Sequence, residues 1–166
     1  MSVAPFVRVL IATAFLATGC GTQSPPKVDR LELVNGNGMG GTALEVHLQS
    51  DGKGRFEFKG MDLPSPATGN FSISPERFTK MVAELEPMRR DARPTSDASV
   101  LSPTCSGTYV TDSGGFYVRW TGPGFDEHMR FDFGCDARRY KSRNDRLEAM
   151  MEDLPVPRSR QSLGAR

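Results

Sequence analysis

Histidine is scarce in this sequence, and neither sign of charge is in excess. The 166 residues include only 2 histidines, and 21 lysines and arginines stand against 20 aspartates and glutamates. A balanced chain has no overall electrostatic attraction to the phosphates of DNA or RNA, so we expect no nucleic-acid partner. The composition, 37% hydrophobic and 25% charged, is typical of a globular domain with a core of its own.

The sequence also lacks a recognisable catalytic or cofactor-binding motif. Gly36-x-Gly38-x-x-Gly41 has the spacing of a dinucleotide-binding loop, but a strand pattern follows where that motif requires a helix. Asp112-Ser113-Gly114-Gly115 is similar to the nucleophile segment of trypsin-like proteases, but neither histidine lies in a motif that supplies a base. His47 and His128 fall on polar faces of predicted strands, where we expect exposed side chains and no shared metal site. We therefore expect a protein that is not an enzyme and uses no cofactor or metal.

The N-terminal apolar run is too short to cross a bilayer, which takes about 20 residues. This run, Val9–Ala17, follows a single cation, Arg8, and ends in small residues, which is the layout of a secretory signal. Cys20 comes directly after Leu16-Ala17-Thr18-Gly19, and the segment resembles the lipobox of bacterial lipoproteins. The resemblance implies that residues 1–19 are a signal peptide that is removed and that Cys20 is acylated, with palmitate as a typical fatty acid. An ordinary signal peptide with a chance cysteine is the alternative.

The same resemblance implies a place in the bacterial cell envelope, with the membrane as a partner through the lipid. In a cell with two membranes, Gly21 in place of aspartate after Cys20 favours the outer membrane, facing the periplasm. Residues 20–27 are expected to form a short tether, residues 28–157 a single domain, and residues 158–166 a flexible tail.

Alternating apolar residues predict two β-hairpins. Leu44–Leu48 and Phe56–Phe58 flank a turn at Asp51-Gly52, and Phe116–Trp120 and Met129–Phe133 flank a turn at Gly122–Gly124. Each strand has one apolar and one polar face, so the sheet is expected to be covered on one side only. Residues 60–70 are expected to be an irregular loop before a brief strand at 71–73, and residues 89–103 a mobile connection.

Two helices are expected to cover the apolar face. Ser74-Pro75 predicts the start of the first helix, whose apolar residues recur from Phe78 to Leu85 and which Pro87 is expected to end. The second carries its apolar positions between Leu147 and Leu154. The predicted fold is therefore α+β, with an antiparallel sheet built from two hairpins and one face covered by two helices.

The cysteines bear on the topology as well as on the anchor. If Cys20 carries lipid, Cys105 and Cys135 remain as a pair in an oxidising compartment, where a disulfide is expected. A strand over residues 109–111 in a simple meander would place these two cysteines about 20 Å apart, too far for a bond. A loop over residues 106–114 brings Cys105 to the open end of the second hairpin beside Cys135. We therefore predict that loop and that disulfide.

Two surface features are candidates for recognition. The first is a basic run that either forms a solvated helix flank or contacts anionic surface groups such as lipid phosphates, and its members are Arg138, Arg139, Lys141, Arg143 and Arg146. The second is a set of aromatic residues, Tyr109, Tyr117 and Phe125, predicted in loops and on a polar strand face.

The mature chain as a whole resembles small uncharacterised envelope domains of bacteria, through its two hairpins, its Ser74-Pro75-Glu76 helix start and its closing helix. The resemblance supplies no catalytic residues. It implies a lipid-anchored module with a binding or structural role, for which an envelope protein is a candidate partner. Two alternatives stay open: an inhibitor of an exogenous hydrolase that uses a protruding loop (residues 36–41 or 106–114), and an unrecognised envelope enzyme.

Overall fold

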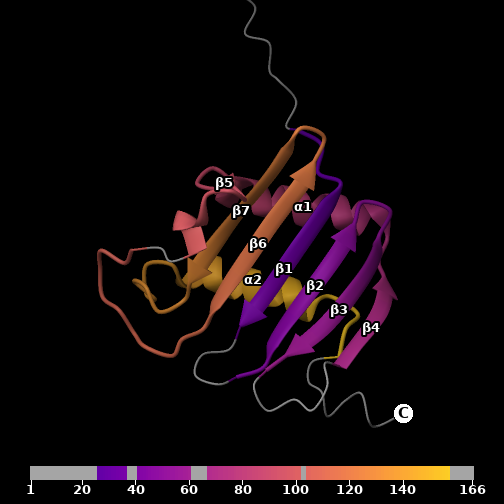
Figure 1. The fold of residues 1–166 in the computed structure, drawn as a ribbon. Coiled ribbons are helices and arrows are strands. Elements are labelled where there is room, and N and C mark those ends of the chain that lie inside the picture. Colours follow the sequence, from indigo (N-terminus) through magenta and orange to yellow (C-terminus); the bar gives the residue numbers. More distant parts are fainter. Residues whose placement is uncertain (1–25, 37–40, 61–66, 102–103, 158–166) are drawn as a thin grey trace, which may run out of the picture.

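A computed structural model describes residues 26–36, 41–60, 67–101 and 104–157 (Figure 1). These residues form a seven-stranded antiparallel sheet with the order β4-β3-β2-β1-β6-β7-β5, together with two α-helices. The strands are β1 (Arg30–Gly36), β2 (Ala43–Gln49), β3 (Lys53–Lys59), β4 (Ala67–Ser72), β5 (Arg93–Pro94), β6 (Gly115–Gly122) and β7 (Phe125–Asp132). The helices are α1 (Pro75–Arg89), α2 (Lys141–Glu152) and the short 3-10 helix η1 (Ala98–Leu101). The α+β class and the antiparallel sheet are thus confirmed, whereas Cys20, the signal segment and the tail lie outside the described residues.

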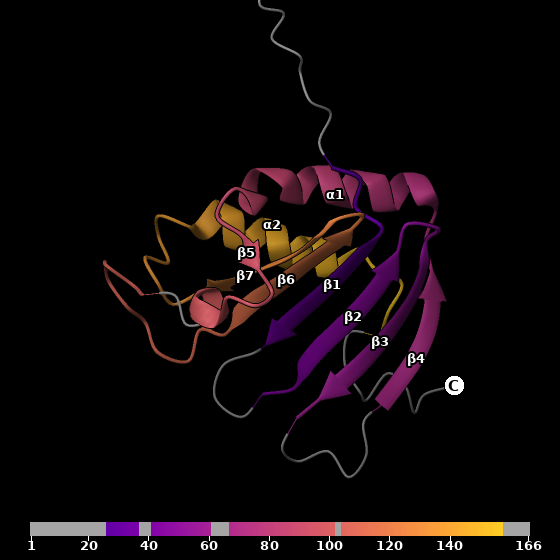
Figure 2. The ribbon, with the colours of Figure 1, turned by 45° about the horizontal axis from the view of Figure 1, so that its top comes forward.

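Both α-helices lie on the same side of the sheet and leave the other side open (Figure 2). Strand alternation directs Leu33, Val118 and Trp120 toward the helices, and none of the three is exposed to solvent. The helices contribute Phe78, Met81 and Leu85 from α1, and Leu147, Met150 and Met151 from α2. These side chains form one hydrophobic core between the two layers. Neither helix, within the described part of the chain, is long and apolar enough to cross a membrane.

Helix α1 begins as the sequence predicts and ends later. The Ser74 hydroxyl accepts a hydrogen bond from the Arg77 amide at 3.2 Å, and Pro75 occupies the first turn. Pro87 was expected to end the helix, but α1 continues to Arg89. Proline costs a helix only one hydrogen bond near its end, and the Arg89 side chain is held by the Glu127 carboxylate at 2.7 Å. A contact distant in sequence therefore stabilises the last turn.

Strand β4 is longer than predicted. Residues 67–70 were assigned to an irregular loop, but β4 starts at Ala67 and pairs with β3 over its length. The reason is packing around glycines: a Cβ atom on Gly69 would lie 2.5 Å from the Phe56 ring, and one on Gly54 would lie 2.3 Å from the Phe71 ring. The two rings fill the space above the two glycines, which stabilises the pairing in a way that local propensity does not reveal.

The connection between α1 and β6 is also more structured than expected. Residues 89–103 were predicted to be a mobile connection, yet the described part of them contains β5 and η1, and β5 pairs with β7 at the edge of the sheet. The His128 side chain donates to the Asp97 carbonyl oxygen at 2.7 Å and so holds this segment against the sheet.

The sheet has two distinct ends. The described chain begins at Pro26, where Asp29 donates its amide to the Thr121 carbonyl at 2.8 Å, and we call this the tether end. The turns at Asp51-Gly52 and Gly122–Gly124 lie there too. The opposite end, which we call the far end, carries Gly36, the start of β6 and the Cys105–Cys135 disulfide.

Candidate functional site

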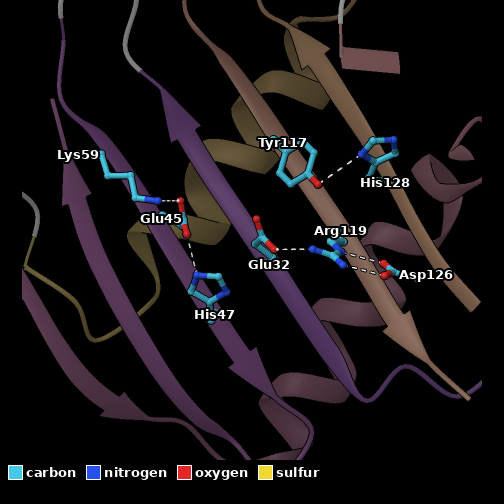
Figure 3. A network of polar contacts seen from close by, with 8 residues as sticks. All are labelled: Glu32, Glu45, His47, Lys59, Tyr117, Arg119, Asp126 and His128. Atoms are coloured by element: carbon cyan, nitrogen blue, oxygen red, sulfur yellow. Dashed lines mark hydrogen bonds and ion pairs between the residues drawn. The ribbon is translucent and has the colours of Figure 1, made fainter. Parts of the chain in front are cut away.

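The open face of the sheet carries charged and polar side chains from five neighbouring strands, β3, β2, β1, β6 and β7 (Figure 3). Because Glu32 of β1 pairs with His47 of β2 on one side and with Arg119 of β6 on the other, these residues form a row across the sheet. The same alternation that buries the apolar residues against the helices places this row opposite them.

An ion-pair network lies at one side of this face. Nε and Nη2 of Arg119 each donate to one oxygen of Asp126 at 2.7 Å, and Glu32 lies 3.5 Å from Nη1 of the same guanidinium. The hydrogen bonds from Arg119 lower the pKa of Asp126 below its ordinary value of 3.8 and raise the pKa of Arg119. A bidentate pair of this kind holds both charges at neutral pH and is poorly suited to transfer a proton.

Glu45 is the centre of a second charged group, with a side chain only 14% exposed. It accepts a hydrogen bond from Nζ of Lys59 at 2.6 Å and another from Nε2 of His47 at 2.7 Å. Burial by itself raises the pKa of Glu45, but these two donors outweigh burial and lower it below 4.5. Glu45 therefore stays ionised and bound to its neighbours.

These two carboxylates predict a loss of stability in acid. Because the pKa of each group is lower in the folded state than in the unfolded state, its ionised form stabilises the fold. This stabilisation is complete at pH values above the unfolded-state pKa values of 3.8 (Asp126) and 4.5 (Glu45), and it is lost as the pH falls through the lower folded-state pKa values. Each pair is partly exposed to solvent, which screens the charges, so we expect about 0.5–1 kcal/mol from each. Urea unfolding at pH 7, 4.5 and 3 measures this. Arg119→Met should reduce the acid-dependent loss, and an unchanged loss in that variant would contradict the assignment.

His128 lies on the predicted face, but it is not the exposed residue that the sequence suggested. It is only 4% exposed because the segment from β5 to η1 lies over it. Its Nε2 donates to the Asp97 carbonyl, so its Nδ1 is free to accept from the Tyr117 hydroxyl at 3.4 Å. His47, on β2, is separated from His128 by two strands, and no group of three or more metal-ligating side chains is present among the described residues.

Replacing His128 by phenylalanine is expected to destabilise the fold by about 1–3 kcal/mol, because the Asp97 carbonyl and the Tyr117 hydroxyl lose their partner. The free energy of unfolding from urea denaturation measures the effect. His128→Gln keeps a donor for Asp97 and should lose less. Equal losses in the two variants would show that the hydrogen bond contributes nothing.

A groove of about 570 Å³ opens at the far end, where the open face meets the chain that precedes β6. Its walls combine apolar, aromatic and charged side chains, which include Val34, Leu101, Tyr109, Tyr117, Arg130 and Asp132. Nη1 of Arg130 lies 3.4 Å from the Leu101 carbonyl and joins η1 to the sheet. The groove is thus built from four separate stretches of the chain: β1, η1, the loop that leads into β6, and β7.

The predicted disulfide is confirmed, and it lies in the loop region whose Tyr109 lines this groove. Cys105 and Cys135 are bonded with their Cα atoms 5.5 Å apart, and no named strand or helix spans residues 104–114 in the described structure, as the loop prediction required. The amide of Val110 donates to the Gly134 carbonyl at 2.9 Å, and that of Asp136 donates to the Thr108 carbonyl at 2.8 Å. The backbone of the loop is therefore fixed while its side chains point outward.

Three large hydrophobic side chains are exposed in this region. They are Leu101 (36% exposed), Val110 (50%) and Tyr109 (55%), and we call this set the far-end rim. Sequence reasoning identified only Tyr109. Leu101 and Val110 could have been found from the sequence, because each belongs to an apolar dipeptide, Val100-Leu101 or Tyr109-Val110, inside an otherwise polar connection.

The turn interpretation of Asp112–Gly115 agrees with the geometry. Asp112 and Gly114 have positive φ values of 63° and 73°, and the Ser113 hydroxyl donates to the Val110 carbonyl at 3.3 Å. Ser113 therefore helps to close the turn before β6.

The predicted aromatic set is divided between the two ends of the molecule. Tyr109 and Tyr117 both line the far-end groove. Phe125 lies near the tether end, where the guanidinium of Arg89 stacks 4.2 Å above its ring. The three residues of this candidate set therefore do not form one recognition patch, because Phe125 lies at the hairpin turn and Tyr109 lies at the opposite end of the strands.

The basic run is only partly exposed. Arg143 is half-buried over the rings of Tyr140 and Phe131, at 4.3 and 5.1 Å, and burial lowers its pKa. Lys141 is paired with Asp145 at 2.6 Å. Arg138, Arg139 and Arg146 remain exposed. The first two follow Cys135 at the far end, away from the point where the chain leads toward Cys20.

No known relative identifies this site. Comparison with family models, with curated proteins and with solved structures finds no match. The chemistry of the site therefore has to be read from its own residues, and the largest exposed apolar side chains of the described chain are those of the far-end rim.

Proposed function

We propose that this protein is a lipid-anchored module of the bacterial cell envelope that binds an envelope protein and has no catalytic role. The observation that supports the binding role is the far-end rim: Leu101, Tyr109 and Val110 are exposed, the first two line the groove, and Tyr109 pairs with Cys135 of the disulfide. Exposed hydrophobic residues that gather in one place are typical of interaction sites.

The position of the rim suits an anchored protein. The described chain starts at the tether end, and five residues, 21–25, lie between Cys20 and Pro26, so the six steps from one to the other reach about 20 Å when extended. The rim lies at the other end of strands of seven or eight residues, about 25 Å away. A tether that leaves the domain at Pro26 therefore does not cover the rim.

The rigidity of the loop supports recognition of a protein. Backbone hydrogen bonds from Val110 and Asp136, together with the disulfide, hold the loop before any partner arrives. A preformed loop loses little conformational entropy on binding, and tyrosine is among the residues that contribute most to interfaces.

The open face supports a role without catalysis. The pKa values of Glu45 and Asp126 are lowered, because Glu45 is hydrogen-bonded to Lys59 and His47 and Asp126 to Arg119. Both carboxylates are therefore unsuited to act as general acids or bases at neutral pH.

Inhibition of an exogenous hydrolase remains a second candidate, because the disulfide-bonded loop presents Tyr109 and Val110 outward. In that role the loop would enter the cleft of the enzyme. The same surface serves both functions, so the nature of the captured partner distinguishes them.

Capture from envelope extracts tests the proposal. The full chain should retain a specific protein, and Tyr109→Ser with Val110→Ser should retain at least tenfold less, since hot-spot residues contribute about 2 kcal/mol or more. Lys80→Ser, on the exposed side of α1, is the matched control and should bind like the wild type. Equal recovery with all three proteins would contradict binding through the rim, and loss of a hydrolase activity on addition of the protein would favour the inhibitor.

A further inference from the structure

The two edges of the sheet differ in how they are protected. At one edge, β5 consists of two residues, Arg93 and Pro94, so a charge and a proline block further pairing. At the other edge, β4 has six residues, Ala-Thr-Gly-Asn-Phe-Ser, with no charge and no proline. No described strand pairs with its outer side. An uncharged edge of this length favours the addition of another strand.

The ladder shows which peptide groups β4 offers. The Ile73 amide donates to the Gly52 carbonyl at 2.9 Å, and Phe71, Gly69 and Ala67 follow in steps of two opposite β3. Since bonding alternates along an antiparallel ladder, the N–H and C=O groups of the intervening residues point away from β3. These residues are Thr68, Asn70 and Ser72, and all three are exposed.

We propose that β4 pairs antiparallel with β4 of a second copy of this chain. In an antiparallel pair, directly opposite residues lie on the same face of the sheet, so the two-fold axis must pass through a residue position and not between two residues. The two central positions of β4 that the axis can pass through are Gly69 and Asn70. The register centred on Asn70 places Asn70 opposite Asn70 and Thr68 opposite Ser72, and it alone uses all three outward positions. It also brings each Phe71 beside Gly69 of the other copy, on the helix-covered face.

A second copy fits this edge better than an extending series of copies or a charged strand. Because β4 carries no charge, its pairing with itself brings no like charges together. The pairing is two-fold symmetric and uses up the β4 edge of both copies, so the assembly closes at two copies.

The dimer leaves both far-end rims free, because β3, β2 and β1 separate β4 from the strand that carries the loop. Its two-fold axis is perpendicular to the sheet, so the two tether ends point in opposite directions along the strands. If the chain is anchored through Cys20, the sheet then lies along the membrane with both tethers at equal height. Dimerisation itself does not depend on the anchor.

Cysteine cross-linking of the full chain in bacterial envelopes tests the register. Asn70→Cys should give a disulfide-linked dimer in most molecules, because opposite Cα atoms of a hydrogen-bonded pair lie about 5.5 Å apart. Thr68→Cys should not cross-link to itself, at about 14 Å along the strands, but should do so with Ser72→Cys when the two are co-expressed. The parent chain, without an introduced cysteine, is the control. A disulfide-linked dimer of the parent chain through Cys20 would show that Cys20 carries no lipid, and it would not affect the test of β4.

Size measurement of the detergent-solubilised full chain provides a second readout. Asn70→Pro removes the outward N–H without breaking a bond to β3 and should convert the dimer to a monomer, whereas Asn70→Thr keeps the N–H and should remain dimeric. A cross-link from Asn70→Cys to a different protein would show that β4 accepts the strand of another partner. That result, the absence of any cross-link, or equal sizes of the two variants would overturn the proposal.

Discussion

Replacing Trp120 by alanine is expected to lower the free energy of unfolding by about 3–5 kcal/mol. Trp120 lies in β6, opposite Leu31 of β1 and Glu127 of β7, and none of its surface is exposed. Removing the indole leaves a cavity in the middle of the core, which neighbouring strands cannot fill without breaking their pairing. Urea denaturation followed by far-UV circular dichroism measures the change, because the chain has 1 tryptophan and the variant loses its fluorescence.

Trp120→Phe is the matched variant. Nε1 of Trp120 is buried without a hydrogen-bond partner in the described structure, so phenylalanine removes no hydrogen bond and leaves a smaller cavity. We expect a smaller loss than for alanine. A loss below about 1 kcal/mol for Trp120→Ala would contradict the packing described for this core.

Removing the disulfide is expected to cost about 3–4 kcal/mol. Cys105 and Cys135 are 30 residues apart, and the chain-entropy model gives this value for a closed loop of that length. Cys105→Ser with Cys135→Ser, compared with the wild type in urea, measures the effect. Wild type treated with a reductant should show the same loss, and an unchanged free energy after reduction would contradict a stabilising role.

The same double variant has a functional consequence. Without the disulfide, the loop keeps its hydrogen bonds to Gly134 and Asp136 but loses its covalent link to Cys135, so Tyr109 and Val110 lose part of their fixed position. We expect partner binding to weaken at protein concentrations and temperatures at which the sheet remains folded.

Patterns local to the chain predicted most of the architecture. Period-two alternation located the strands of both hairpins, and Ser74-Pro75 located the start of α1. The disulfide was predictable because a distance argument excluded the meander in which the cysteines are far apart. In each case a single segment, or one pair of residues, was sufficient.

Features that depend on distant segments were not predictable. Strand β4 starts at Ala67, before the brief strand predicted at residues 71–73, because the Phe56 and Phe71 rings cover glycines on the neighbouring strand. Helix α1 passes Pro87 because Arg89 reaches Glu127 of β7. Similarly, His128 is buried by the segment that contains Asp97, 31 residues earlier in the chain. No local pattern contains this information.

The candidate site shows the same limit. The groove at the far end joins Val34 of β1, Leu101 of η1 and Tyr117 of β6, and only its tyrosines were conspicuous in the sequence. Partial burial of Arg143 also removed one member of the basic run, because a guanidinium on a helix can stack on nearby rings instead of facing solvent.

Metabolic labelling with a fatty-acid precursor tests whether this protein is a lipid-anchored module. The full chain should incorporate the label and remain with the membrane fraction, and Cys20→Ser should lose both properties. The variant with Cys105→Ser and Cys135→Ser should keep the label, since those cysteines pair with each other. Equal labelling of wild type and Cys20→Ser would contradict the anchor, whereas loss of label in Cys20→Ser alone is the result that we predict.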